Sequence, residues 1–386
     1  MADVDLEAVR AHLGSAGQEP GPVEVGAALR SLGMLVSESA VRQTVSALRR
    51  DSVGAGILDP LLRLPGVTDV LVNAPDEVYL DRGQGLERAE VRFSGEAEVR
   101  RLAVRLAASV GRRLDDGSPF VDARLASGVR VHAVLPCVAD SGTCLSLRVP
   151  NRNRLSIADW VASGSLTDQG AALLAGLVST RRAFLVSGGT GAGKTTLLGA
   201  LLGLVPAAER IVIAEDSREL QPEHPHCVRL EGRPPNAEGI GAVTLTDLVR
   251  QALRMRPDRL VVGEVRGAEL ADLLSALNTG HEGGCGTVHA NSAADVPARL
   301  EALGALGGMG RDALHAQLAA ALQVLVHVRR LSDGRRWVEE VRLVRPDAAT
   351  GRCVVVPAIR FRPGAASVPG DGYEQLCRLV GGTDAP

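Results

Sequence analysis

Eight consecutive residues have the types and the spacing that cradle phosphate groups. They fit the pattern G-x-x-x-x-G-K-[ST] and are Gly188, Gly189, Thr190, Gly191, Ala192, Gly193, Lys194 and Thr195. An apolar segment that reads as a strand precedes them, and a helical segment follows. Glycines let the backbone turn tightly and point N–H groups at phosphate oxygens, and the helix N-terminus adds partial positive charge. In such a P-loop the lysine contacts the β- and γ-phosphates, and the Thr195 hydroxyl is a ligand for Mg²⁺.

Lys194 is the only lysine in a chain that has 43 lysine and arginine residues. Its ammonium is a compact point charge, whereas arginine ends in a wide planar fork, so the two are not interchangeable inside a tight loop. The lone lysine also bears on the nucleotide. GTPases usually read guanine with an Asn-Lys-x-Asp loop, and a chain without a second lysine cannot form one. We therefore expect ATP and Mg²⁺ as the cofactors.

Hydrolysis of a bound nucleotide also needs a carboxylate that activates water or orders Mg²⁺. Two predicted strands end in such residues: one in Glu215-Asp216, with Glu219 soon after, and another in Gly263-Glu264. Strands and helices alternate here, so we expect a mainly parallel sheet whose strand ends share one edge. Solvated surface charge is the alternative for any single acid, but two such strand ends in a P-loop domain favour a catalytic site.

Two histidines lie in the glycine-rich segment NTGHEGGCGTVHANS, His281 and His289. Near a γ-phosphate, a histidine can sense or stabilise charge. Zinc binding is the alternative, either by these two residues with Cys285 or by the His and Cys residues of segment 224–227. Neither set has the paired spacing of a structural zinc site.

Four arginines are candidates for contact with a phosphate. Arg124 and Arg130 lie in DARLASGVRVH, and Arg229 and Arg233 lie in VRLEGRPPN. Beside a Pro-Pro pair or in a strand–turn–strand, such a residue can reach a phosphate, in its own or a neighbouring subunit. Surface solvation, the role of most arginines here, is the alternative for each.

The composition narrows the class of protein. Of the 386 residues, 45% are hydrophobic and 2% are aromatic, and the formal net charge is −2. Few aromatic side chains and no basic excess argue against a nucleic-acid motor, which usually needs a basic track with stacking platforms. No secretory signal or membrane-spanning run is visible, so we expect a soluble, cytoplasmic protein with reduced cysteines.

The pattern of segments predicts an α/β protein with two domains. Residues 156–363 alternate strands and helices around the P-loop, and residues 56–150 read as strands with one long helix, a small α+β domain. Helical segments over 1–55, a polar linker over 151–155 and a loose Gly/Pro/Ala-rich tail over 364–386 complete the prediction.

Five motifs, in the same order along the chain, resemble those of the type II/type IV secretion ATPase superfamily. Their residues are most similar to those of the Tad/Flp pilus-assembly ATPases. They are GGTGAGKTT, RIVIAEDSREL, VRLEGRPPNAEG, VTLTDLVRQALRMRPDRLVVGEVRGAEL and NTGHEGGCGTVHANS. The similarity also covers VTDVLVNAPDEVYLDR and SPFVDARLASGVRVHAVLP, and spans roughly residues 57–345. The four-cysteine zinc module of the pilus-extension and type II branches has no counterpart here.

The resemblance implies a C-terminal RecA-like P-loop domain and a smaller N-terminal α+β (PAS-like) domain. It extends the P-loop to Thr196, and places Glu215 as a candidate water activator and Glu219 beside it in an acidic box. Glu264 is then the acid of the second nucleotide motif, which holds Mg²⁺ directly or through water, and His289 belongs to a histidine box. Further implied contacts are Arg124 and Arg130 with the nucleotide, and Arg229 and Arg233 as charge-stabilising residues.

The sequence therefore leads to one main hypothesis and two rivals. The main one is a homohexameric ATPase at the cytoplasmic face of the membrane, which drives pilus assembly or type II/IV-like secretion through inner-membrane platform proteins. A RecA-like nucleic-acid motor is the first rival. A scaffold that binds ATP without hydrolysing it is the second, and the carboxylates argue against it.

Overall fold

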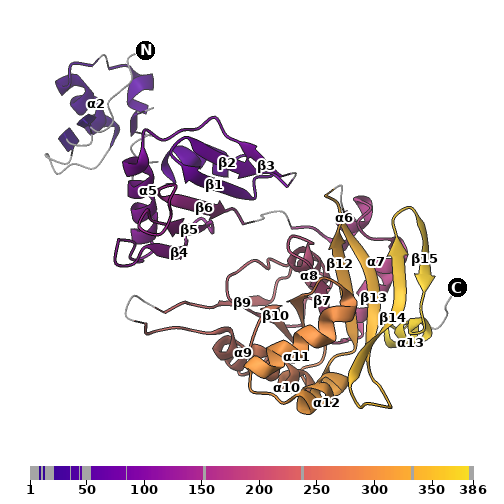
Figure 1. Cartoon of the computed structure of the whole chain (residues 1–386). Coiled ribbons are helices and arrows are strands. Elements are labelled where there is room, and N and C mark those ends of the chain that lie inside the picture. Colours follow the sequence, from indigo (N-terminus) through magenta and orange to yellow (C-terminus); the bar gives the residue numbers. More distant parts are fainter. Residues whose placement is uncertain are drawn as a thin grey trace. The chain divides into compact units, whose positions relative to one another are not determined.

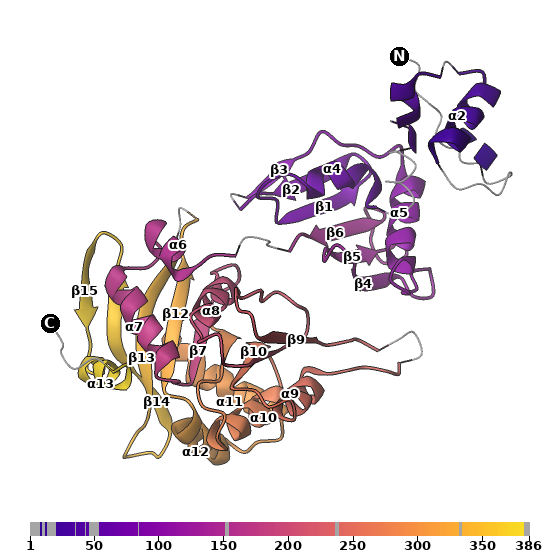
Figure 2. The same cartoon turned by 180° about the vertical axis from the view of Figure 1, so that it is seen from behind.

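The computed structural model describes residues 8–9, 12–13, 21–34, 36–42, 44–45, 54–83, 85–150, 154–235, 239–331 and 334–381 (Figures 1 and 2). The chain divides into two compact units, Met1–Asn151 and Arg152–Pro386. This division falls in the segment predicted as a linker, of which residues 151–153 lie outside the described residues.

The first unit begins with a small helical cluster and continues into a sheet. In the described part of residues 1–55, helix α2 (Pro22–Ser31) packs in a separate apolar cluster with Val9, Leu13 and Val45. A short turn follows, made of η1 (Gly56–Leu58) and α4 (Asp59–Leu62). Residues 38–42 and 44–45 are also helical, whereas residues 1–7, 10–11, 14–20, 35, 43 and 46–53 of the predicted N-terminal helical segment lie outside the described residues.

An antiparallel sheet with one long helix forms the main body of the first unit, as expected for an α+β domain. The strand order is β3-β2-β1-β6-β5-β4. The bounds are β1 (Asp69–Ala74), β2 (Glu77–Asp81), β3 (Leu86–Arg88), α5 (Glu96–Ala108), β4 (Phe120–Arg124), β5 (Arg130–Val134) and β6 (Cys144–Arg148). Alternate residues of β1, β5 and β6 join α5 in one core, so the opposite face of the sheet is polar.

The second unit is built on a nine-stranded sheet of order β15-β14-β13-β12-β7-β11-β10-β8-β9. From β12 to β9 all neighbours are parallel, which confirms the predicted mainly parallel sheet. The bounds of these six strands are β7 (Phe184–Gly188), β8 (Ile211–Glu215), β9 (Cys227–Glu231), β10 (Arg259–Val265), β11 (Cys285–His289) and β12 (Val324–Arg330). The near-continuous apolar runs of β7, β8, β10, β11 and β12 reflect burial on both faces, whereas β9 at the edge of the sheet is only partly buried.

Helices cover both faces of this sheet, as in a RecA-like core. One face packs against α6 (Ile157–Ala162), α7 (Asp168–Ser179), α8 (Lys194–Leu202) and α13 (Tyr373–Leu379) (Figure 2). The other packs against α9 (Leu245–Leu253), α10 (Glu269–Asn278), α11 (Val296–Leu306) and α12 (Arg311–Ala321), with the short η2 (Ala293–Asp295) before α11 (Figure 1). In the described parts of the chain, no helix is both long and apolar enough to cross a membrane.

An antiparallel extension follows the parallel core and was not predicted. It consists of β13 (Arg336–Pro346), β14 (Cys353–Arg362) and β15 (Ala365–Pro369), each antiparallel to the strand before it. The prediction of a loose tail over 364–386 is wrong for residues 365–379, which form β15 and α13. The glycines that suggested disorder serve tight packing instead, since Gly370 lies against the carbonyl of Pro357 and leaves no room for a Cβ.

The tail contributes to the core of the second unit. Leu376 of α13 is fully buried, and the Gln169 amide of α7 donates a hydrogen bond to the Tyr373 hydroxyl at 3.1 Å. Leu376→Ala should lower the free energy of unfolding by about 2–5 kcal/mol, because it leaves a cavity. Val368→Ala, at an exposed position of β15, should change it by no more than about 0.5 kcal/mol. Urea denaturation of the full chain measures both, and equal effects would contradict an ordered tail.

Candidate functional site

The P-loop connects β7 to α8, as the sequence predicts. Gly191 and Gly193 have φ values of +69° and +97°, which favour glycine. Gly193 is the N-cap of α8, so Lys194, Thr195 and Thr196 form the first helical turn. A Cβ built on Gly188 would lie 2.4 Å from the Val328 carbonyl oxygen of β12. Only glycine fits at that position, because the neighbouring strand approaches so closely.

Lys194 folds back over its own loop. Its Nζ donates hydrogen bonds to the carbonyl oxygens of Gly188 at 3.0 Å and Gly189 at 2.9 Å. Burial lowers the pKa of Lys194, and the negative charge of Glu264 opposes that shift. These bonds hold the ammonium close to the backbone N–H groups of the loop and helix, so that both can contact the same anion.

Glu215 ends β8 in a tightly enclosed position, with 3% of its surface exposed. Its Oε1 accepts hydrogen bonds from the backbone N–H groups of Glu219 and Leu220, both at 3.0 Å. Its Oε2 is buried and has no hydrogen-bond partner within the described residues. Burial raises the pKa of Glu215, and the two N–H donors oppose that shift. One carboxylate oxygen is thus anchored, and the other is buried without a hydrogen-bond partner within the described residues.

A glycine on the next strand makes room for this carboxylate. A Cβ built on Gly263 of β10 would lie 2.5 Å from Cγ of Glu215. Because β8 and β10 are adjacent and parallel, the absent side chain of Gly263 is what lets Glu215 lie against the strand.

Glu264 follows Gly263 and pairs with a residue that the sequence prediction missed. The Arg266 guanidinium donates to Glu264 Oε2 at 2.5 Å. Burial lowers the pKa of Arg266, but Glu264 and the charges of Asp216 and Glu219 raise it more, so the net shift is upward. Arg266 follows Glu264 by two residues at the end of β10. This close spacing of an acid and a base is the sequence pattern from which the ion pair could have been predicted.

The strand order brings the P-loop, Glu215, Glu264 and His289 to one edge of the sheet. β7, β11, β10 and β8 are consecutive neighbours and end at or near Gly188, His289, Glu264 and Glu215. His289 pairs directly with Gly188 in the β11–β7 register. Parallel strands present their carboxyl ends together, which is the usual place for a ligand in such a sheet.

Arg229 and Arg233 are not placed against the P-loop by any contact in the described structure. Arg229 is an exposed residue of β9, and it donates to the Leu220 carbonyl at 3.3 Å. Arg233 donates to the Gly241 carbonyl at 3.0 Å, in the long loop after β9 (Figures 1 and 2). Their roles toward a phosphate therefore stay predictions.

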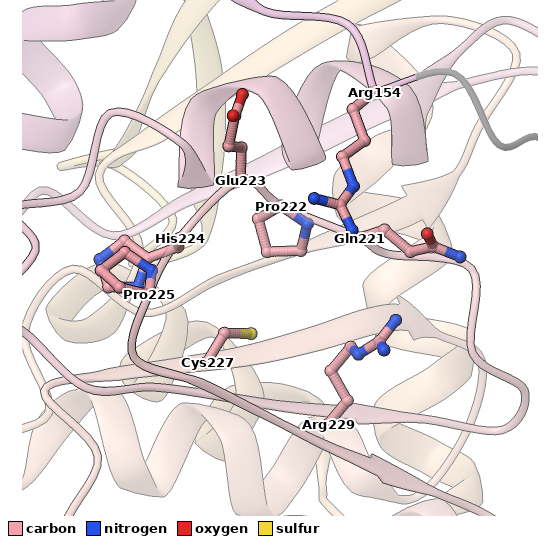
Figure 3. A pocket seen from close by; sticks show the side chains of 8 residues that line it. All are labelled: Arg154, Gln221, Pro222, Glu223, His224, Pro225, Cys227 and Arg229. Atoms are coloured by element: carbon pink, nitrogen blue, oxygen red, sulfur yellow. The ribbon is translucent and has the colours of Figure 1, made fainter.

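Arg229 instead lines a cavity of about 370 Å³. In Figure 3 the Arg154 side chain enters from above and the Arg229 side chain from below, and the Cys227 thiol lies to their left. P-loop residues do not line this cavity. The residues that do are Arg154, Gln221, Pro222, Glu223, His224, Pro225, Cys227 and Arg229.

Arg124 and Arg130 belong to the first unit and lie side by side there. They are directly opposite in the β4–β5 register, and Arg130 is also opposite Arg148 of β6. The three arginines form a row across the polar face of the sheet. Arg148 was missed, although the alternation of apolar and polar residues in CLSLR signals it. Contact of Arg124 and Arg130 with a nucleotide stays a prediction.

No group of three or more His, Cys, Asp or Glu residues in the described ranges is arranged to hold a metal ion. Cys285 of the glycine-rich segment is buried in β11, and burial raises the pKa of its thiol to about 12. At neutral pH this thiol stays protonated and is a poor metal ligand.

Comparison with known proteins decides the family. The profile described as "Type II/IV secretion system protein" matches residues 51–354. The chain belongs to this family. A putative conjugal transfer protein of Mycobacterium tuberculosis is 57% identical over 328 residues, which cover 83% of this chain and 93% of that protein. The conjugal transfer protein TrbB of Rhizobium radiobacter is 31% identical over 282 residues, covering 72% and 84%.

Solved structures agree on the fold of this type II/IV secretion family member. The ATPase DotB of Yersinia pseudotuberculosis matches with a TM-score of 0.53 at 16% identity, covering 82% of this chain and 81% of that one. The ATPase DotB of Legionella pneumophila matches with a TM-score of 0.50 at 18% identity, covering 74% and 78%. With its intact P-loop and carboxylate edge, the chain is an ATPase of the type II/IV secretion family.

Gly263→Ala tests the packing between β10 and Glu215. The added methyl group should displace the carboxylate, lower ATP turnover and reduce the free energy of unfolding by about 1–3 kcal/mol. Gly199→Ala in α8 is the matched control, because its Cβ would meet only Leu220 Cδ2 at 3.8 Å. It should retain turnover and gain up to about 1 kcal/mol of helix stability. Phosphate release and urea denaturation measure the two effects. Wild-type turnover and stability in Gly263→Ala would contradict the close approach.

Proposed function

We propose that this chain is a homohexameric motor at the cytoplasmic face of a membrane, which hydrolyses ATP to drive pilus assembly or type II/IV-like secretion through inner-membrane platform proteins. The observation that carries the proposal is the shared strand edge, where the P-loop, Glu215 and Glu264 meet in a member of the type II/IV secretion family. The names of relatives support the coupling to export, since they include conjugal transfer proteins and the type IV secretion protein PtlH of Bordetella pertussis.

The residues at this edge fit a nucleotide with Mg²⁺. Backbone amides of the P-loop and the Lys194 ammonium would hold the phosphates. The Thr195 hydroxyl and the Glu264 carboxylate are hard oxygen donors of the kind that Mg²⁺ prefers. When bound, Mg²⁺ neutralises charge on the phosphates. Arg266 engages only Oε2 of Glu264, so Oε1 would serve a cation or its water while the ion pair balances the charge of the carboxylate.

Glu215 is the residue best placed to take a proton from the attacking water. Its anchored Oε1 fixes the carboxylate, and its partnerless Oε2 is the oxygen that would accept a hydrogen bond from the attacking water. A pKa raised by burial makes the ionised carboxylate a stronger base. His289 and Glu219 stand close along the same edge, and we assign them supporting contacts with the nucleotide.

Lys194→Ala tests the nucleotide site directly. Loss of the point charge should weaken ATP binding and abolish turnover, and Lys194→Arg should not restore turnover because a planar fork replaces a compact ammonium. Arg362→Ala, an exposed cation on β14, is the control and should behave as wild type. Calorimetric titration and phosphate release measure the outcome. Wild-type turnover in Lys194→Ala would overturn the site, and strong stimulation of the wild-type ATPase by single-stranded DNA would favour the nucleic-acid motor.

The pH dependence of turnover tests Glu215. The base must be unprotonated to act, so a raised pKa moves the acid-side loss of kcat/KM to a higher pH than the ordinary glutamate range near about 4.3. Glu215→Gln should lower kcat by about 10²–10⁴-fold while ATP still binds. Glu282→Gln, an exposed residue before β11, should leave both the rate and the pH profile unchanged. A Glu215→Gln protein with wild-type kcat would rule out this base.

A further inference from the structure

The hairpin between β12 and β13 borders the P-loop. β12 pairs with β7 up to His327 opposite Ser187, so the next residues of β12 run alongside the start of the loop. The Val328 carbonyl already faces Gly188. β13 then begins at Arg336, which lies directly opposite Arg330 at the end of β12. The hairpin thus carries two arginines to the mouth of the P-loop.

These two arginines flank the two left-handed glycines of the loop. A Cβ built on Gly193 would lie 2.8 Å from Cδ and 3.5 Å from Cγ of Arg336, so the stem of Arg336 occupies the space beside Gly193. A Cβ built on Gly191 would lie 3.8 Å from Nη1 of Arg330. Both side chains therefore border the backbone whose N–H groups would hold phosphate oxygens.

The charge of Arg336 is poorly compensated. Burial lowers the pKa of Arg336, and the neighbouring charge of Arg330 lowers it further. Across residues 154–235, 239–331 and 334–381, no acceptor forms a hydrogen bond or ion pair with the Arg336 guanidinium. Its strand neighbours differ, since Arg329 pairs with Glu339 at 3.4 Å and Arg342 with Glu340 at 3.1 Å. Burial of a cation that has no anionic partner costs free energy.

We infer that Arg336, with Arg330 beside it, contacts a phosphate group of the nucleotide that the P-loop binds. The inference rests on the proposed function, because it takes the P-loop as the nucleotide site. The guanidinium presents paired donors that match phosphate oxygens, and the anion supplies the partner that Arg336 lacks among the described residues. The hairpin thereby forms a second cationic wall of the site, apart from the four arginines predicted from the sequence.

The chain carries its own reporter for this contact. It has two tryptophans. Cη2 of Trp160 in α6 is 3.3 Å from the Cβ position of Gly193, and Trp337 follows Arg336 in β13 and is 4% exposed. Intrinsic fluorescence should therefore change when an anion binds at the loop, without any added label.

The test compares Arg336→Gln with Arg335→Gln in the full chain. The probes are ADP, ATP and inorganic pyrophosphate, each with Mg²⁺, titrated by calorimetry and tryptophan fluorescence. Arg336→Gln should weaken the affinity for all three by about tenfold or more, as expected for a lost hydrogen bond between charged groups. Arg335→Gln, the exposed neighbouring arginine, should bind as wild type. Arg336→Lys keeps the side-chain stem and one charge without the paired donors, so its affinity should lie between those of the wild type and Arg336→Gln. If Arg336→Gln folds poorly, a weakened affinity in Arg336→Lys still tests the inference.

Three outcomes would overturn the inference. One is wild-type affinity in a folded Arg336→Gln protein, and another is an equal loss in Arg335→Gln. A loss for ADP and ATP but not for pyrophosphate would show that the guanidinium contacts the nucleoside and not a phosphate. Lys194→Ala separates this failure from that of the proposed function. If Lys194→Ala abolishes binding while Arg336→Gln does not alter it, the P-loop site stands and only the contact of Arg336 falls.

Discussion

The P-loop lies between neighbours that leave no room for side chains, and the second unit is organised around that constraint. The carbonyl of Val328 closes one side at Gly188, and the stem of Arg336 with the indole of Trp160 closes another at Gly193. The loop backbone must also adopt left-handed conformations to turn its amides inward. The positions of the backbone N–H groups in this site depend on the elements that pack against the loop. β12, β13 and α6 are therefore part of the site.

Charge within the described part of this edge is balanced internally in most places. Lys194 is held by loop carbonyls, and Glu264 is held by Arg266. Glu215 and Arg336 are the exceptions, with one unpartnered carboxylate oxygen and one unpartnered guanidinium among the described residues. Burying polar groups without partners costs free energy. A ligand or a water that bonded to these two groups would therefore gain the most binding free energy. The two groups lie on opposite sides of β7, the strand that leads into the P-loop.

The antiparallel extension has two consequences for the same site. It places the β12–β13 hairpin beside the P-loop, and it ends in a helix that packs on α7 through Leu376 and Tyr373. The terminal segment looked loose because glycine, proline and alanine carry little apolar signal of their own. In the fold those residues provide close turns against β14, and a few apolar side chains of α13 are enough to anchor the segment.

The sequence by itself determined the P-loop, the carboxylates at the strand ends and the parallel core, because each depends on residue types at adjacent positions or on a local alternation of strands and helices. Arg266 and Arg148 were within reach of the same reasoning. Only the tertiary structure decided the space that Gly263 leaves for Glu215 and the placement of Arg336 beside Gly193. Those contacts join residues about 50 and 140 positions apart, and strand order and register bring them together, which no local pattern encodes.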